Sequence, residues 1–429
     1  MSDSGELLVS ASQDGTARVW SSRTTVPVAV LRGHRNEVTH ALFGPGGQLV
    51  TTSRDRTVRL WQLQAPRLLA AGKPWQTTAA LDMRGQQWVL CGEKDTNRVS
   101  CRLQPVASAA ALAATAASAP PGAGVALGEI KPGETLAGAS LSADGSLLLA
   151  RRGSHDLQAR HQPVLWRLAD RNPISLPWLA QFSQAAFNPQ RAEWLAMGQD
   201  GSLTLWPQAA LGVAEPPVPL WRAAPQAGRS AAVPSPDGRW IAVAQGAVVQ
   251  LFDRQAAAAT PPRLLAGHLG DVRALAFSSD SQALVSASAD RSARVWRVSD
   301  AGSPPASVLL RGGHSAALSS AAFSPDGAWV VTASADNSVR VWDARLGLER
   351  AALYRHAGAV NQAIFDASGE WILSVSDDGT AVLGRCDACR MPLGALRQRA
   401  RDAVHLASDE QAALGAERGQ APKNFLLPR

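Results

Sequence analysis

Cysteine, lysine and long apolar runs are all scarce in this sequence. Four cysteines among 429 residues are too few for a disulfide framework, which is typical of a reducing compartment, so we expect a cytoplasmic location. The N-terminal residues lack a basic start followed by an apolar run, and we expect no secretory signal. The longest weakly polar run covers residues 106–119, shorter than the roughly 20 apolar residues of a membrane helix. We therefore expect no membrane association.

Positive charge is carried by arginine and is spread thinly along the chain. The formal net charge is +7, and lysine occurs only at positions 73, 94, 131 and 423. The densest basic segment is LRQRAR at 396–401. Because nucleic-acid-binding proteins concentrate Lys and Arg on one patch or stripe, we expect no nucleic-acid partner. Abundant alanine and arginine with scarce lysine favours a GC-rich, bacterial genome as the source.

The common catalytic and metal-binding motifs are also missing. Gly72-Lys73 is followed by Pro74, which excludes a phosphate-binding G-x-x-x-x-G-K-[ST] loop. Cys386 and Cys389 form a single C-x-x-C without the second pair that a zinc site needs. We therefore expect no metal and no cofactor, and we interpret these cysteines as packing residues, with zinc binding or redox chemistry as the alternative. A small-molecule ligand is neither indicated nor excluded.

What the sequence does contain is a repeat. A twelve-residue pattern, V-[ST]-x-S-x-D-x-[ST]-x-R-[VL]-W, ends at Trp20, Trp61, Trp296 and Trp342. Weaker copies end at positions 101, 166, 206, 252 and 384. The mean interval between copies is about 45 residues, a length typical of repeat architectures. The one long interval holds an Ala/Pro-rich stretch at about 104–127, which we interpret as an insertion.

Each copy of the pattern predicts a small antiparallel sheet. Short β-branched runs flank a polar turn, and most copies follow a second hairpin such as the one around Asp326-Gly327, where Asp-Gly favours a tight turn. A sheet of three or four short strands cannot bury both faces alone, whereas copies stacked around a ring cover one another. The sequence therefore predicts an all-β protein.

These repeats resemble those of the WD-repeat β-propeller family. That family's blade opens with Gly-His and closes with Trp-Asp, and the matching positions are Gly33-His34, Gly267-His268, Gly313-His314 and Trp342-Asp343. The resemblance implies four-stranded antiparallel blades. The C-x-x-C, the basic segment after it and the tail are also similar to the ends of bacterial WD-repeat regions attached to signalling NTPases.

The resemblance also implies a hydrogen-bonded network inside several blades. In the family, a His before the first strand, a Ser or Thr on the second, an Asp in the next turn and a Trp on the third form one chain of contacts. The corresponding sets are His34, Thr51, Asp55 and Trp61; His268, Ser286, Asp290 and Trp296; His314, Thr332, Asp336 and Trp342; and His356, Ser374 and Asp378, with Gly384 in place of the Trp.

The spacing supports a structural role for these sets. His precedes Asp by 21 or 22 residues, and Asp precedes Trp by six in every clear copy, so one turn geometry brings the groups together. A hydrolase triad needs one exposed nucleophile, whereas here the same set recurs beside a Trp that would cover it. We therefore predict no catalytic residues and no enzymatic activity.

The predicted architecture is one propeller followed by a tail. We assign residues 1–389 to the propeller, with eight blades favoured and seven as the alternative. Residues 27–32 would supply the outer strand that closes the ring, with residues 7–20 as an extra hairpin; alternatively, the chain is the C-terminal part of a longer protein. Helical spacing at Leu393, Leu396, Ala400 and Val404 predicts a helical tail over residues 390–429.

The resemblance implies a non-catalytic scaffold that binds protein partners. The His-bearing loop and the Asp-bearing turn lie at the same end of each blade, so their neighbours are expected to line one binding face. The alternative is a sensor or regulatory part of a bacterial signalling NTPase whose catalytic region is on another chain or missing. The predicted face consists of Gln13, Asn36, Glu37, Arg54, Gln199, Leu269, Ala289, Ser315, Ala335 and Asp377.

Overall fold

The structure, a computed structural model, covers most of the repeat region. It describes residues 1, 7–21, 27–32, 34, 36–44, 48–55, 57–62, 67–71, 78–81, 87–94, 98–105, 125–126, 134–154, 162–169, 173–174, 176–212, 219–226, 228–256, 260–298, 307–310, 312–353 and 356–386. The helical tail predicted over 390–429 and most of the insertion predicted at about 104–127 lie outside these residues.

The described residues form β-strands joined by turns, with short 3₁₀ segments at η2 (Pro177–Gln181) and η3 (Gln208–Gly212). The strands pair antiparallel in small sheets whose order follows the sequence almost everywhere. The prediction of an all-β chain built from four-stranded antiparallel sheets is therefore confirmed.

The chain divides into two compact units. The first comprises Met1–Ala65 with Asp387–Arg429, and the second comprises Pro66–Cys386. The assignment of residues 1–389 to one propeller and of residues 390–429 to a tail stays a prediction. We refer to the two units as the N-terminal unit and the ring unit.

The N-terminal unit contains two three-stranded sheets among its described residues. Both are antiparallel, and strand β1 of the first sheet lies against strand β4 of the second. The first sheet is β1 (Leu7–Ala11), β2 (Thr16–Ser21) and β3 (Pro27–Arg32); the second is β4 (Val38–Gly44), β5 (Gln48–Ser53) and β6 (Val58–Gln62).

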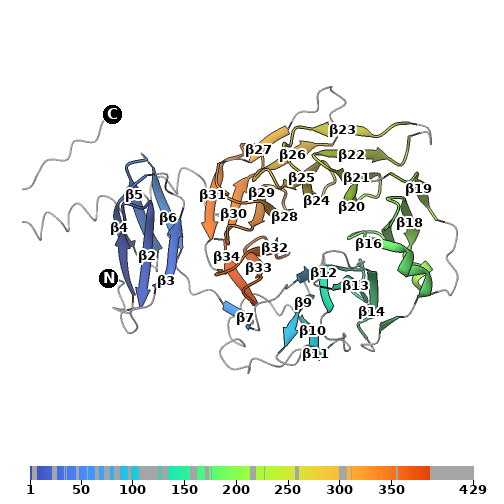
Figure 1. Cartoon of the computed structure of the whole chain (residues 1–429), viewed down its shortest axis with the longest axis horizontal. Coiled ribbons are helices and arrows are strands. Elements are labelled where there is room, and N and C mark those ends of the chain that lie inside the picture. The colour runs from blue at the N-terminus through green and yellow to red at the C-terminus, as the bar shows by residue number, and fades with distance from the viewer. Residues whose placement is uncertain are drawn as a thin grey trace, which may run out of the picture. The chain divides into compact units, whose positions relative to one another are not determined.

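The ring unit contains seven four-stranded sheets among its described residues. Figure 1 shows them following one another around a ring. Their strands are β8 (Thr78–Leu81), β9 (Gln87–Lys94), β10 (Arg98–Pro105) and β11 (Val125–Ala126); β12 (Glu134–Leu141), β13 (Leu147–Ser154), β14 (Gln162–Arg167) and β15 (Pro173–Ile174); β16 (Phe182–Phe187), β17 (Glu193–Gly198), β18 (Leu203–Pro207) and β19 (Trp221–Ala223); β20 (Arg229–Pro234), β21 (Trp240–Gln245), β22 (Val248–Asp253) and β23 (Arg263–Ala266); β24 (Val272–Phe277), β25 (Ala283–Ser288), β26 (Ala293–Arg297) and β27 (Ser307–Leu310); β28 (Leu318–Phe323), β29 (Trp329–Ser334), β30 (Val339–Asp343) and β31 (Glu349–Leu353); β32 (Val360–Phe365), β33 (Trp371–Ser376) and β34 (Thr380–Arg385), together with β7 (Arg67–Ala71).

The last of these sheets joins the two ends of the ring unit. Strand β7 pairs antiparallel with β34, with Ala71 opposite Thr380 and Arg67 opposite Leu383. The sequence prediction placed residues 27–32 in this closing role, but those residues form β3, which pairs with β2 inside the N-terminal unit. An eight-bladed ring closed by residues 27–32 therefore does not fit the strand pairing.

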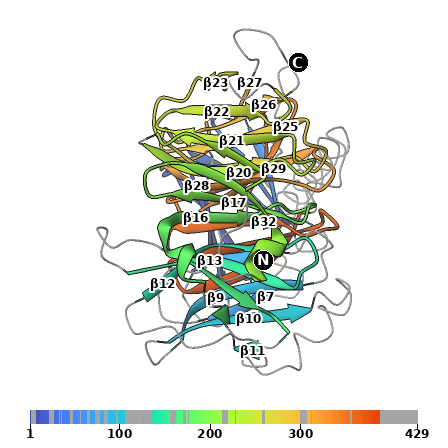
Figure 2. The ribbon, with the colours of Figure 1, turned by 90° about the vertical axis from the view of Figure 1, so that its right-hand side faces the viewer.

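Apolar residues fill the space between neighbouring sheets. One core cluster joins the β24–β27 sheet to the next through Val285, Ala293, Val330 and Trp342. Another joins the β20–β23 and β24–β27 sheets, and Figure 2 shows β21 to β23 beside β25 and β26. Within the ring unit a sheet has neighbours on both faces, so residues pointing to either face of a strand are buried. Strand β17 shows this, because every one of its residues is buried.

Candidate functional site

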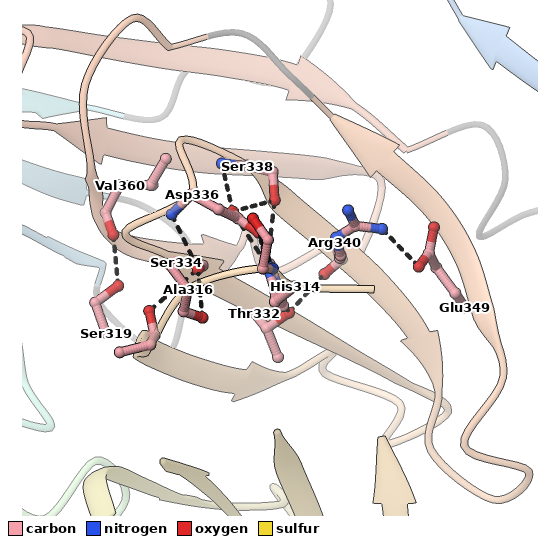
Figure 3. A network of polar contacts seen from close by, with 12 residues as sticks. His314, Ala316, Ser319, Thr332, Ser334, Asp336, Ser338, Arg340, Glu349 and Val360 are labelled. Atoms are coloured by element: carbon pink, nitrogen blue, oxygen red, sulfur yellow. Dashed lines mark hydrogen bonds and ion pairs between the residues drawn. The ribbon is translucent and has the colours of Figure 1, made fainter. Parts of the chain in front are cut away.

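A chain of hydrogen bonds runs through the β28–β31 sheet (Figure 3). The indole N–H of Trp342 donates to Thr332 Oγ1 at 2.8 Å, and that hydroxyl lies 2.8 Å from His314 Nε2. His314 Nδ1 lies 3.0 Å from Asp336 Oδ2 in the turn between β29 and β30. Thr332 lies on β29, next to β30, which carries Trp342, and its side chain also faces the loop before β28, which carries His314. The strand register therefore places the Thr332 hydroxyl within reach of both partners.

The β24–β27 sheet repeats this arrangement. Trp296 Nε1 donates to Ser286 Oγ at 2.9 Å, Ser286 Oγ lies 2.7 Å from His268 Nε2, and His268 Nδ1 lies 2.9 Å from Asp290 Oδ2. Ser286 is 0% exposed. The structure therefore brings together all four residues of each of these two predicted sets.

The protonation states follow from burial and hydrogen bonding. Burial lowers the pKa of His268 and His314, although their Asp partners act in the opposite direction. Burial by itself would raise the pKa of Asp290, but hydrogen bonds from Ser292, from the Leu269 N–H and from His268 outweigh it and lower that pKa to about 2. A neutral imidazole beside an ionised carboxylate donates from Nδ1 and accepts at Nε2, so each network is fully satisfied.

Two further predicted sets form part of the same arrangement, but each differs from the two complete networks. His34 Nδ1 lies 3.0 Å from Asp55 Oδ2, and its Nε2 lies 2.7 Å from Thr51 Oγ1; the side chain of Trp61 is outside the described part. His356 Nε2 lies 2.8 Å from Ser374 Oγ. Its Nδ1 is closer to Thr380 Oγ1, at 2.9 Å, than to Asp378 Oδ2, at 3.3 Å.

Sequence reasoning missed one recurring member of these networks. A hydroxyl two residues after each Asp donates to that carboxylate, as Ser292 Oγ does to Asp290 Oδ1 at 2.6 Å and Thr57 Oγ1 to Asp55 Oδ1 at 2.6 Å. The signal was present, because the repeat pattern has Ser or Thr at that position in every clear copy. This hydroxyl contributes to the low pKa of the Asp.

The β16–β19 sheet lacks such a network. Ala196 occupies the second-strand position that is Ser286 or Thr332 elsewhere, since Trp194 pairs with Trp206 as Leu284 pairs with Trp296. The indole nitrogens of Trp194 and Trp206 are buried without a hydrogen-bond partner. Aromatic packing holds this sheet together instead, with the Trp194 and Trp206 rings stacked at 6.1 Å and Trp178 5.7 Å from each.

The networks offer no reactive group to a substrate. The Ser286 hydroxyl is completely buried and already shared between His268 and Trp296, whereas nucleophilic catalysis needs an accessible nucleophile beside its base. Groups of His, Cys, Asp or Glu arranged to hold a metal ion are absent from the residues described. That same part of the chain contains no helix of the length and apolar character needed to span a membrane.

The networks attach the loops to the turns at one end of each sheet. The Leu269 N–H donates to Asp290 Oδ2 at 2.9 Å, and the Ser315 N–H donates to Asp336 Oδ2 at 2.9 Å. The backbone adds a second attachment, from the Ala289 N–H to the Asp271 carbonyl at 2.8 Å. The His loop is therefore attached to the end of its sheet by both side-chain and backbone hydrogen bonds.

The predicted face residues of the ring unit lie at this end. Equivalent backbone N–H donors are Ala335 and Asp377, which bond to carbonyls of the loop before the first strand, and Gln199, which bonds to the Gln181 carbonyl at the end of η2. Leu269 is 91% exposed. Gln199, Ser315 and Ala335 are exposed, whereas Ala289 and Asp377 are half-buried.

The remaining face residues lie in the N-terminal unit. Gln13, Asn36 and Arg54 are exposed and Glu37 is half-buried. Arg54 Nε lies 3.1 Å from Glu37 Oε2, and the Arg54 N–H donates to the Glu37 carbonyl. The predicted single face is thus divided between the two units.

Cys386 is the only cysteine of the C-x-x-C among the described residues. Cys386 is 3% exposed and disulfide-bonded, to a cysteine whose side chain is outside the described part. A disulfide is more typical of an oxidising compartment, so the cytoplasmic location stays a prediction.

Comparison with known proteins identifies the repeats. The family of the WD domain, G-beta repeat, matches residues 1–21, 25–62, 259–297, 306–343 and 348–383. These segments end at or next to strands β2, β6, β26, β30 and β34, which carry the last positions of the sequence repeat.

Short segments of the chain are similar to curated proteins. Nuclear distribution protein PAC1 of Yarrowia lipolytica is 47% identical over 62 residues, 14% of this chain and 14% of that protein. Protein Notchless of Drosophila melanogaster is 40% identical over 55 residues, 13% of this chain and 11% of that protein. WD repeat-containing protein 37 of Homo sapiens is 42% identical over 60 residues, 14% of this chain and 12% of that protein. Each match spans a small part of the relative's length. These relatives come from eukaryotes, and the resemblance to bacterial signalling proteins stays a prediction.

A solved structure shows the fold over a larger part. A chain in "Crystal Structure of Mitotic Checkpoint Complex" superimposes with a TM-score of 0.56 at 14% identity, covering 74% of this chain and 90% of that one. At this identity the likeness concerns the fold alone. Taken with the repeated four-stranded sheets and the buried networks, the WD40 repeats and WD-repeat relatives of this chain support a place in the WD-repeat propeller family.

Proposed function

We propose that the chain is a non-catalytic scaffold that binds a protein partner through the loop end of its ring unit. In this proposal the seven four-stranded sheets of Pro66–Cys386 are the blades of a seven-bladed propeller. The observation that carries the proposal is Leu269, a large apolar side chain that is 91% exposed on a loop whose backbone is bonded to the buried Asp290. A rigid apolar contact of this kind favours association, because little conformational entropy is lost on binding.

Other residues at the same end of the sheets fit this role. Ala289, close to Gly270 in the Leu269 loop, and Ala335, at the equivalent position of the next sheet, are small and uncharged, so they leave room for a partner's side chains. Interface centres are depleted of charge and exclude water around apolar anchors. The buried networks supply rigidity, and the completely buried hydroxyls inside them support a scaffold in preference to an enzyme.

Affinity purification with matched variants tests this proposal. Leu269→Glu combined with Ala335→Glu should abolish recovery of the partner by the tagged full-length chain, since two charges would be buried in the contact. Leu346→Glu is the control, because Leu346 is 62% exposed in the turn between β30 and β31, at the opposite end of its sheet. Equal recovery with all three proteins would refute the loop end as the binding face.

A further inference from the structure

The loop end of the β24–β27 sheet, which is the end that carries the His268 loop, has two exposed arginines among its described residues. These are Arg273 and Arg291. In the part of the chain that the structure describes, neither guanidinium has a carboxylate within ion-pair distance. Asp271 is also exposed there, whereas the Asp290 carboxylate is engaged in the buried network. The charge open to a partner at this end is therefore mainly positive.

Arg291 is held in a backbone conformation that disfavours its side chain. Its φ is 69°, in the left-handed region where glycine is at ease and other residues are uncommon. The same turn position is Gly201, Asn337 or Gly379 in other sheets, each with its N–H bonded to the carbonyl three residues earlier. Backbone strain of this kind clusters at ligand-binding and active sites. The arginine at this turn therefore indicates a use for its charge.

Arg273 lies at the β-bulge of the first strand. The register of β24 against β25 shifts around this residue, and a bulge aims the side chain of its extra residue away from the regular alternation. The same position is Ser183, Ser230 or Ser319 in other sheets, and those hydroxyls donate to backbone carbonyls. In this sheet the position carries an exposed cation instead.

Leu269 lies beside the turn that carries Arg291. Its N–H donates to the Asp290 carboxylate at 2.9 Å, and Asp290 directly precedes Arg291. The next residue, Gly270, is so close to the turn that a Cβ there would lie 3.0 Å from the Asp290 nitrogen. The loop then leads into β24, which carries Arg273. An apolar side chain that is 91% exposed therefore shares one end of one sheet with two cations.

We propose that the loop end of the β24–β27 sheet binds an acidic peptide segment of the partner protein. An apolar side chain of that segment would pack against Leu269, and Asp or Glu side chains on either side of it would pair with Arg273 and Arg291. Charge complementarity favours this occupant, because arginine forms bidentate hydrogen bonds with carboxylates and opposite charges across an interface speed association and fix its register. The proposal rests on the scaffold function proposed above and names the chemistry of the partner at that binding face.

Peptide selection on the full-length chain tests this chemistry. A phage-displayed library of random dodecapeptides is selected on the wild type, and the recovered peptides are sorted by whether they still bind a Leu269→Asn chain. This substitution removes the apolar contact without adding charge, so the peptides that lose binding are those that use the loop end. We expect these peptides to be enriched in Asp and Glu on either side of an apolar residue.

Charge reversal at the two arginines gives a matched measurement on the same peptides. Fluorescence anisotropy should show an affinity about tenfold weaker for the Arg273→Glu, Arg291→Glu chain, because each substitution replaces an attraction with a repulsion. Arg297→Glu is the control, because Arg297 is exposed at the other end of β26. It should leave the affinity unchanged.

The variant Arg291→Gly separates binding from a structural role. Glycine adopts the positive φ of this turn without strain, so we expect a melting temperature equal to or above that of the wild type together with weaker peptide binding. A lower melting temperature with unchanged affinity would show that the arginine serves the turn itself, and would overturn its assignment to the partner.

Two results would overturn the acidic partner and leave the scaffold proposal in place. One is a set of loop-end peptides that are neutral or basic, and the other is equal affinity for the wild type and the charge-reversed chain. A selection in which no peptide depends on Leu269 would overturn both proposals. Binding of random-sequence single-stranded DNA that is lost in the Arg273→Glu, Arg291→Glu chain, with no acidic peptide selected, would assign the arginines to nucleic acid instead.

Discussion

The Thr332 hydroxyl lies between two buried partners, 2.8 Å from Trp342 Nε1 and 2.8 Å from His314 Nε2. Because it accepts from the indole and donates to the imidazole, one side chain satisfies two groups that are shielded from water. Replacing Thr332 would leave the Trp342 indole N–H and His314 Nε2 without this partner, so a mutation at this residue tests the network.

Thr332→Val keeps the shape of the side chain and removes the hydroxyl. We expect a loss of roughly 2–4 kcal/mol in the free energy of unfolding, because each buried polar group left unpaired costs about 1–3 kcal/mol. Urea unfolding followed by circular dichroism measures this loss. Thr332→Ser should restore most of the stability, and a Val variant as stable as the parent would contradict the shared role of the hydroxyl.

Ala196→Ser supplies the hydroxyl that the β16–β19 sheet lacks. We expect a gain of about 1 kcal/mol in unfolding free energy, since the buried Trp206 N–H acquires an acceptor. A double-mutant cycle with Trp206→Phe isolates this contact, because the gain should vanish when the indole N–H is absent. A gain that persists in the Phe background would show that the stabilisation has another origin.

Asp336 and Asp326 offer a comparison of buried and exposed turn carboxylates. Asp336→Ala removes the acceptor for His314 and for the Ser315 N–H, and we expect a loss of about 2–4 kcal/mol. Asp326 accepts the Ala328 N–H in an exposed turn, so Asp326→Ala should cost about 1 kcal/mol or less. Thermal unfolding of the two variants compares them, and equal losses would count against the buried network.

The networks predict that the ring unit becomes less stable as the pH falls. Burial lowers the pKa of His268 and His314 from 6.5 in the folded state, so the unfolded chain binds more protons below that pH. Stability therefore rises with pH in this range and is lost as the pH falls below about 6.5. The Asp290 carboxyl, with its pKa lowered to about 2, adds a second loss as the pH falls below 3.8 towards 2.

Melting temperatures measured between pH 8 and pH 5 check this prediction. The variant His268→Gln, His314→Gln should have a lower melting temperature at pH 8 and a flatter dependence on pH. The same slope in the parent and the variant would assign the effect to other groups.

The sequence predicted the parts of the fold that depend on local spacing. The six-position spacing from Asp290 to Trp296 and from Asp336 to Trp342 fixes a turn and a strand register. The structure places these residues in the networks with their His and hydroxyl partners. The sequence did not predict the exposure of Leu269 or the division of the face residues between two units. Both depend on which sheets pack against each other, and local spacing carries no information on that packing.

Spacing and residue type by themselves determined an all-β chain, its repeated antiparallel sheets and its buried hydrogen-bonded sets, since turns, β-branched runs and polar spacing act over a few residues. Only the tertiary structure decided that β7 pairs with β34 and that β3 stays with β2. The reason is physical: an outer strand is held through backbone N–H and C=O groups that nearly every residue carries, so a short segment such as Arg67–Ala71 fits more than one sheet edge. The packing of the other sheets selects the edge it takes.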